Sequence, residues 1–120
     1  MNLVLDIGNT NTKAGWFEKG RLTENRRLGK LTPKHLTRIL SSYPVDQVMV
    51  SSVNHPVREL LKLAGSRLKV LLFLDHTIPL PFKISYQTPE TLGHDRIAAA
   101  AGALCLYPGS HILVMDLGTA

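Results

Sequence analysis

Residues 3–13 read LVLDIGNTNTK, an apolar run that ends in an acid, a glycine and a series of short polar residues. Residues 2–7 are nearly all apolar, which is typical of a strand that is buried on both faces of a sheet. Residues 9–11 have turn chemistry, and the alternation over 12–17 indicates a second strand. The stretch therefore predicts a β-hairpin whose turn carries polar side chains.

This hairpin has the residue types that hold a phosphate group or a hydrated Mg²⁺ ion. Asp6 ends the first strand, and the glycine that follows lets a ligand approach the backbone. Asn and Thr side chains, with exposed N–H groups in the turn, can donate to phosphate oxygens, and Lys13 adds a cation. The glycine-rich patterns GxxxxGK and GxGxxG do not occur in the chain. Taken alone, the stretch also fits an ordinary hairpin turn, because Asp, Gly and Asn fill turns anyway.

The last residues of the chain repeat the pattern. Residues 110–115 predict a strand, and Asp-Leu-Gly-Thr follows at 116–119. Two such hairpins that face each other could clamp the phosphates of a nucleotide; the alternative is chance recurrence of a common turn composition. A strand and half of a phosphate loop make a poor C-terminus. We therefore expect a first lobe at residues 1–110, and at 111–120 the first strand and the start of the phosphate loop of a second lobe that is otherwise missing.

Strands and helices alternate between the two copies of the pattern. The sequence predicts a third strand at 21–28, a helix from Thr32-Pro33 to Tyr43, a strand at 46–53, a helix from 54–56 to Gly65, a strand at 68–74, an edge strand at 83–86, and a long helix opened by 88–91 and ended by 107–109. Strands that begin as hairpins and then alternate with helices imply an α/β fold. We expect a mixed sheet, antiparallel hairpins first and parallel strands after, flanked by helices.

A third motif, Gly-His-Asp-Arg at 93–96, precedes an alanine-rich helical stretch. Asp95 can accept a proton from a hydroxyl group, and Arg96 can hold a carboxylate as a bidentate fork. Gly93 gives a ligand access to the backbone, and the first N–H groups of the helix favour an anion. The alternative is structural, because an acid early in a helix is favourable in any case.

Composition narrows the class of protein. The chain has 120 residues, 44% hydrophobic and 19% charged, as is usual for a soluble globular protein. No apolar run approaches the ~18 residues of a membrane span, and an acid at position 6 argues against a signal peptide. Cys105 is the only cysteine, so an intramolecular disulfide and a cysteine-rich metal site are excluded. The histidines show no metal-binding spacing. These features favour the cytoplasm.

The formal net charge is +5, and its source is local. The basic residues of one segment are Lys19, Arg21, Arg26, Arg27, Lys30, Lys34 and Arg38. Such a segment can bind nucleic acid, a membrane surface or an anionic small molecule. Aromatic residues do not interleave with it, as a single-strand binder would require. A solvated basic face is therefore favoured over a nucleic-acid site.

Together the three motifs resemble those of the type III pantothenate kinases, members of the acetate and sugar kinase/Hsp70/actin superfamily. The resemblance rests on residues 6–11, on 93–96 with alanines behind them, and on 116–120. The first and third motifs suggest the superfamily, and the middle one, with its spacing to the third, is specific to this family. The resemblance implies a ribonuclease H-like, actin-like ATPase lobe.

The resemblance also implies residue roles. Asp95 would be the catalytic base that takes the proton from the primary hydroxyl of pantothenate as it attacks the γ-phosphate of ATP, and Arg96 would bind the pantothenate carboxylate. Asp6 would lie near Mg²⁺, and Asp116 would bind a monovalent cation, K⁺ or NH₄⁺. The implied ATP-binding residues are Asp6, Ile7, Gly8, Asn9, Thr10, Asn11, Thr12, Lys13 and Thr119, and the implied pantothenate-binding residues are Tyr86, Gly93, His94, Asp95 and Arg96.

The implied activity is ATP-dependent phosphorylation of pantothenate to 4'-phosphopantothenate, the first step of coenzyme A biosynthesis, by a cytoplasmic homodimer. The small residues at 98–103 predict close packing, against another helix of the lobe or the same helix of a second subunit. Family members run to about twice this length as two-lobed proteins, so the chain alone is expected to be inactive. Two alternatives stay open: another small-molecule kinase or phosphatase of the superfamily, and a non-catalytic nucleotide-binding accessory or regulatory protein. Neither membrane nor nucleic acid is an expected partner.

Overall fold

The computed structural model describes residues 1–52, 59 and 68–117. The chain divides into two compact units, Met1–Phe73 and Leu74–Ala120. These two units are defined by contacts within the chain. The predicted boundary at 110/111 is a different one, between a first lobe and a second lobe, and it stays a prediction. None of the helices in the described part of the chain is long and apolar enough to cross a membrane.

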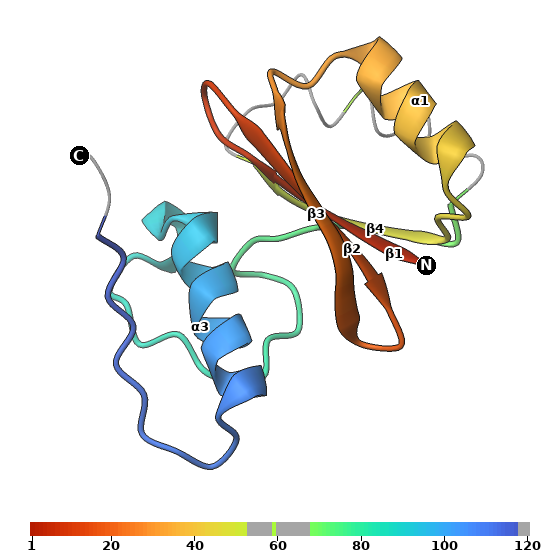
Figure 1. Ribbon diagram of the computed structural model, residues 1–120. Helices are drawn as coiled ribbons and strands as arrows, with labels where there is room; N and C mark the ends of the chain where they lie inside the picture. The colour runs from red at the N-terminus through yellow and green to blue at the C-terminus, as the bar shows by residue number, and fades with distance from the viewer. Residues whose placement is uncertain (53–58, 60–67, 118–120) are drawn as a thin grey trace. The chain divides into compact units, whose positions relative to one another are not determined.

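The first unit is built on a mixed sheet (Figure 1). Within the described residues the sheet has five strands in the order β3-β2-β1-β4-β5. Strands β1, β2 and β3 are joined by antiparallel pairing, whereas β4 pairs parallel with β1 and β5 pairs parallel with β4. The expected mixed sheet, with antiparallel hairpins first and parallel strands after, is confirmed. The strands are β1 Asn2–Ile7, β2 Thr12–Glu18, β3 Arg21–Gly29, β4 Gln47–Ser52 and β5 Val70–Phe73.

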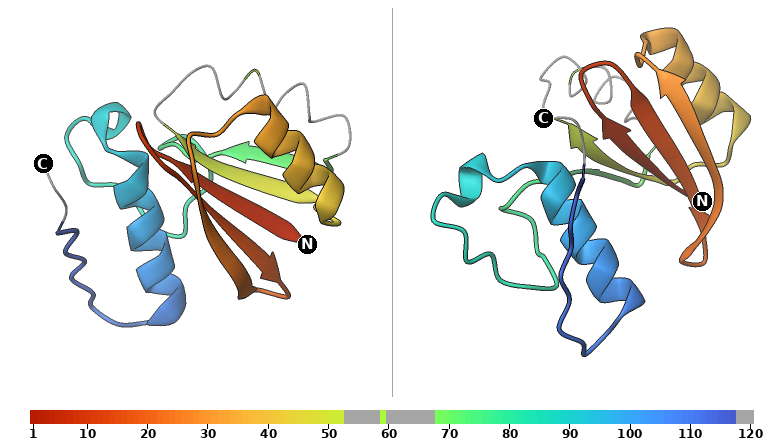
Figure 2. Two further views of the ribbon diagram at one scale, coloured as in Figure 1. Left: turned by 45° about the horizontal axis from the view of Figure 1, so that its top comes forward. Right: turned by 60° about the vertical axis from the view of Figure 1, so that its left-hand side comes forward.

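One face of the sheet carries the core. Leu3 lies opposite Trp16 on β2 and beside Val48 on β4, and all three are almost fully buried. Helix α1 (Pro33–Ser42) covers this face and contributes Leu36 and Ile39 to the core (Figure 2). Of the alternate residues of β1, Val4 and Asp6 are half-buried and Asn2 is exposed. The prediction of a strand fully buried on both faces was therefore wrong: β1 is fully buried on the α1 face alone.

Helix α1 begins and ends where its local sequence predicts. The Thr32 hydroxyl accepts a hydrogen bond from the His35 N–H at 3.2 Å, and proline occupies the first turn. The Tyr43 N–H donates to the Ile39 carbonyl at 3.2 Å, and the backbone then becomes extended before Pro44. The predicted helix from residues 54–56 to Gly65 lies outside the described residues.

The predicted long helix of the second unit is divided into two pieces. A 3₁₀ helix, η2, spans Pro89–Thr91, and α3 spans His94–Leu106. Leu92 and Gly93 between them have extended backbone, with ψ angles of 126° and 133°. The Thr88 hydroxyl bonds the Thr91 hydroxyl at 2.7 Å and does not cap a long helix. The prediction of one continuous helix was wrong, because the Thr-Pro start signal at 88–89 produces a single turn.

Two predicted strands are not formed. Residues 83–86 and 111–117 are without strand structure, and no described residue pairs with either segment in a ladder. A strand requires a neighbour to accept and donate its hydrogen bonds, so apolar composition alone did not suffice. Leu113, Met115 and Leu117 are consequently 81%, 71% and 92% exposed.

Candidate active site

The turn between β1 and β2 is short and solvent-exposed. Ile7 pairs with Thr12, so four residues, 8–11, connect the strands. The Gly8 N–H donates to the Asn11 carbonyl at 3.0 Å and closes the turn. A Cβ atom at position 8 would lie 3.3 Å from that same carbonyl oxygen, tighter than most such contacts. Glycine therefore suits the close approach of the two ends of the turn.

The tip of this turn presents unused donors. Among the described residues, the backbone N–H groups of Asn9 and Thr10 donate to no acceptor. The Asn11 side-chain amide donates to the Thr10 hydroxyl at 3.3 Å. Exposed N–H groups that point out of a turn form a binding surface for an anion such as phosphate. The turn has the chemistry expected of a phosphate loop.

Asp6 and Lys13 flank the turn on the sheet face opposite the core. They are cross-strand partners, with 3.8 Å between the Lys13 Nζ and an Asp6 carboxylate oxygen. The side chains of Asp6 and Lys13 are 48% and 67% exposed. A pair this exposed adds little to stability. Both groups therefore stay available to a ligand, the carboxylate for a cation and the ammonium for a phosphate.

Ile7 and Thr12 lie behind the exposed part of the turn. The Ile7 side chain belongs to the core, so a ligand could reach this residue only through its backbone. Thr12 is 1% exposed, and within the part of the chain that the structure describes its hydroxyl has no hydrogen-bond partner. In this conformation the Thr12 hydroxyl does not reach the surface of the loop, and its predicted contact with ATP stays a prediction.

Ser51 is a neighbour of Asp6 that the sequence reasoning missed. The parallel pairing of β1 with β4 places Ser51 beside Asp6, on the same face of the sheet. No described residue forms a hydrogen bond with the Ser51 hydroxyl. The carboxyl ends of parallel strands are a usual place for ligands. The available signal was the change from the apolar run 48–50 to two serines.

The second unit holds the Gly-His-Asp-Arg motif at the start of α3. Gly93 is the N-cap residue of the helix. The Asp95 carboxylate folds back and accepts a hydrogen bond from the Arg96 N–H at 2.9 Å. A Cβ atom at position 93 would collide with the same Asp95 oxygen. The glycine thus leaves room for the carboxylate, and the side chains of Asp95 and Arg96 are exposed to solvent.

The remaining predicted residues are dispersed. Tyr86 is 50% exposed in the segment before η2, and Asp116 is exposed in the segment after α3. Gly118 and Thr119 lie outside the described residues. The structure brings Asp6 and Lys13 together with the turn at 8–11, and it brings Gly93, Asp95 and Arg96 together at one helix start.

A family model described as type III pantothenate kinase matches residues 2–120. The chain belongs to the type III pantothenate kinase family. The resemblance stated from the three motifs is confirmed.

Curated relatives in this family are similar over almost the whole chain. The type III pantothenate kinase of Phocaeicola vulgatus is 38% identical over 99% of this chain and 49% of its own length. That of Christiangramia forsetii is 40% identical over 99% of this chain and 49% of its own length. That of Cytophaga hutchinsonii is 40% identical, with 99% and 48% covered. The chain spans about half the length of the curated relatives it matches.

Proposed function

We propose that this chain supplies the first phosphate loop and the substrate motif of an ATP-dependent kinase. The reaction is phosphorylation of pantothenate to 4'-phosphopantothenate, the first step of coenzyme A biosynthesis. The match of the family model over residues 2–120 carries the proposal. The exposed donors of the turn at 8–11 support it from the geometry.

The phosphates of ATP bind at residues 6–13. The N–H groups of Asn9 and Thr10 donate to phosphate oxygens, with Gly8 and Asn11 shaping the turn. Lys13 neutralises negative charge, and Thr119 adds a contact from the second loop. Phosphoryl transfer depends mainly on positioning and on neutralisation of charge, which is what these groups supply.

Asp6 is the residue that would hold Mg²⁺. Within the described residues, no group of three or more His, Cys, Asp or Glu side chains could hold a metal ion. A single carboxylate nevertheless fits Mg²⁺, which keeps several water ligands and usually takes one or two carboxylates together with substrate phosphates. The bound ion would neutralise charge on the phosphates. Asp116 is proposed as the ligand of a monovalent cation, K⁺ or NH₄⁺.

Asp95 acts on the pantothenate hydroxyl. Its carboxylate is exposed and held by the Arg96 N–H, so it is positioned to take the proton as the hydroxyl oxygen attacks the γ-phosphate. The exposed Arg96 guanidinium pairs with the carboxylate of pantothenate. Tyr86, Gly93 and His94 complete the substrate contacts.

Membership of the family supports a proposal for the assembly. We propose that residues 1–110 form an actin-like lobe and that 111–120 contribute the first strand and the start of the phosphate loop of a second lobe. Two copies pair through the alanine-rich part of α3, where Ala98, Ala99 and Gly102 are exposed. The cytoplasm is the proposed location.

A test uses a longer protein that contains this chain and its second lobe. Asp95→Asn should reduce pantothenate phosphorylation by about 10² to 10⁴-fold, because a general base typically contributes that factor. ATP binding, measured by calorimetry, should be almost unchanged. Equal loss of both would contradict the base role. Turnover of another small molecule in place of pantothenate would favour a different kinase, and nucleotide binding without turnover would favour an accessory protein.

A further inference from the structure

A hollow of about 450 Å³ lies between β3 and α1. Its polar lining residues are Arg26, Arg27, His35, Arg38, Ser42 and Tyr43. On α1, positions 35, 38 and 42 recur at helical spacing and so share one face. Cationic side chains from two different elements therefore line one concave surface.

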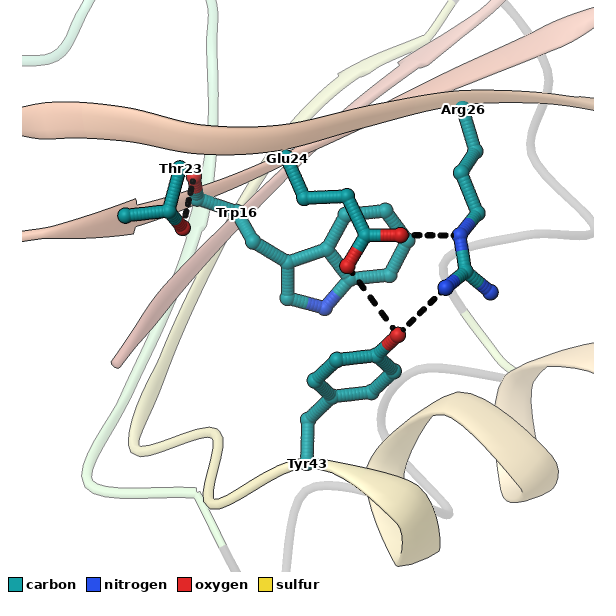
Figure 3. Close-up of polar contacts among 5 residues, drawn as sticks. All are labelled: Trp16, Thr23, Glu24, Arg26 and Tyr43. Carbon is teal, nitrogen blue, oxygen red and sulfur yellow. Dashed lines mark hydrogen bonds and ion pairs between the residues drawn. The ribbon is translucent and has the colours of Figure 1, made fainter.

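Aromatic packing fixes one side of the hollow (Figure 3). The Arg26 guanidinium lies 5.5 Å from the Trp16 ring centroid and 5.7 Å from that of Tyr43. Arg26 donates to the Tyr43 hydroxyl at 2.7 Å, and this hydroxyl donates to Glu24 at 3.1 Å. Glu24 also pairs with Arg26. The Glu24 carboxylate thus contacts both Arg26 and Tyr43, as Figure 3 shows.

The positive charge of the hollow is only partly balanced. Among the described residues, neither Arg27 nor Arg38 has a carboxylate within ion-pair distance. Arg27 pairs across the strands with Lys13, on the face opposite α1. The guanidinium groups that face the hollow are therefore those of Arg26 and Arg38, with one carboxylate, that of Glu24. Like charges on a shared concave surface raise the local potential and attract an anion. Arginine is also the side chain best suited to hold phosphate oxygens in a bidentate manner.

We propose that this hollow binds a phosphorylated small molecule, at a site separate from the phosphate loop. Arg26 pairs across the sheet with Ala14, whose side chain lies on the face that α1 covers. Asp6 and Lys13 lie on the opposite face. The two sites are therefore on different sides of the sheet.

The shape favours a small molecule over nucleic acid. The volume of about 450 Å³ is within the usual range of small-molecule sites. Bound bases need exposed aromatic faces on which to stack. Trp16 is 1% exposed, and the Tyr43 ring packs against it at a centroid distance of 5.0 Å. Neither ring offers a stacking platform.

Inorganic pyrophosphate is the probe for a titration of this chain followed by ¹H–¹⁵N NMR. Trp16 is the only tryptophan, so its indole N–H gives one signal that reports on Arg26 and Tyr43. The amides of Asn9 and Thr10 report on the phosphate loop in the same sample. We expect saturable shifts of the Trp16 indole and of the amides at 35–43. Arg38→Ala should weaken this binding about tenfold, the effect of losing one charge-assisted hydrogen bond.

Arg21→Ala is the matched control, because it removes an exposed arginine of β3 that does not line the hollow. Arg21→Ala should change pyrophosphate binding at the hollow by no more than about twofold, because the side chain that it removes does not line the hollow. Both variants lower the net charge by one, so a difference between them reports on the hollow itself. Equal weakening by the two variants would overturn the proposal and indicate non-specific charge attraction. Shifts at Asn9 and Thr10 without shifts at the hollow would also overturn it. So would saturation of the hollow by a short DNA duplex at lower concentration than by pyrophosphate.

Discussion

Gly93 and Asp95 show how the absence of one side chain can position a neighbouring carboxylate. The Asp95 carboxylate occupies the space that a Cβ atom at position 93 would need. It is held there by the N–H of the next residue, at 2.9 Å. The glycine at this helix start therefore determines where the proposed base points, and a larger residue would change its direction.

Gly93→Ala tests this at the residue scale. The new methyl group should displace the Asp95 carboxylate, and we expect kcat of the longer protein to fall at least about tenfold, as small misplacements of a catalytic group do. Thr37→Ala in α1, at an exposed position outside the proposed sites and the proposed pairing surface, is the control and should leave kcat unchanged. A Gly93→Ala enzyme with wild-type kcat would contradict the positioning role.

At the scale of elements, capping bonds and ion pairs connect the ends of helices and strands. Asp46, just before β4, joins the starts of three parallel strands. Its carboxylate accepts a hydrogen bond from the Met1 ammonium at 2.8 Å and lies 3.4 Å from the Lys69 Nζ. Its backbone carbonyl accepts from Lys69 and Val70. Asp46 thus connects the N-terminal ends of β1, β4 and β5.

The Asp46 link should make stability depend on pH. The hydrogen bond from the N-terminal ammonium, followed by Lys69, holds the pKa of Asp46 below its ordinary value of 3.8. A lowered carboxyl pKa stabilises the folded state above pH 3.8, and this contribution disappears as the pH falls through the lowered pKa. Asp46→Asn should therefore destabilise the chain at pH 6 and have less effect near pH 3, as measured by urea unfolding at both values. The exposed Glu18→Gln variant serves as the control; a pH-independent effect of Asp46→Asn would contradict this account.

The cap of α1 gives a second prediction at this scale. Thr32→Ala removes the acceptor for the His35 N–H and should lower the free energy of unfolding by about 1 kcal/mol. Thr37→Ala, at an exposed position inside the same helix, should be neutral or slightly stabilising because alanine is the better helix former. Both are measured by urea denaturation. Equal losses for the two variants would show that the cap contributes nothing specific.

Elements with local signals were predicted well, and those that depend on distant partners were not. The hairpin strands and α1 carry their own turns and caps, so the sequence placed them within a residue or two. Segments 83–86 and 110–115 lacked a pairing strand, which no local pattern reports. The site divides in the same way. Residues 6–13 form a recognisable loop, but Ser51 comes beside Asp6 only through a parallel pairing of two residues that are 45 positions apart in the chain.

At the scale of the whole molecule, the chain carries one set of proposed site residues in each compact unit. It spans about half the length of its curated relatives. We predict negligible turnover from these 120 residues alone in an ADP-release assay with ATP, pantothenate, Mg²⁺ and K⁺. The full-length enzyme of a relative, under the same conditions, is the positive control. Robust turnover from the chain alone would show that the second lobe is dispensable.

The exposed segment at 112–117 has a practical consequence for handling the protein. Its apolar side chains face water, and its backbone has no ladder partner among the described residues. Such a segment readily adds to a strand of another molecule, which is how unprotected edges promote aggregation. Aggregation of the isolated chain should therefore increase as its concentration rises. Replacing Leu113, which is 81% exposed, with lysine offers a way to keep the chain in solution without changing a residue of the proposed sites.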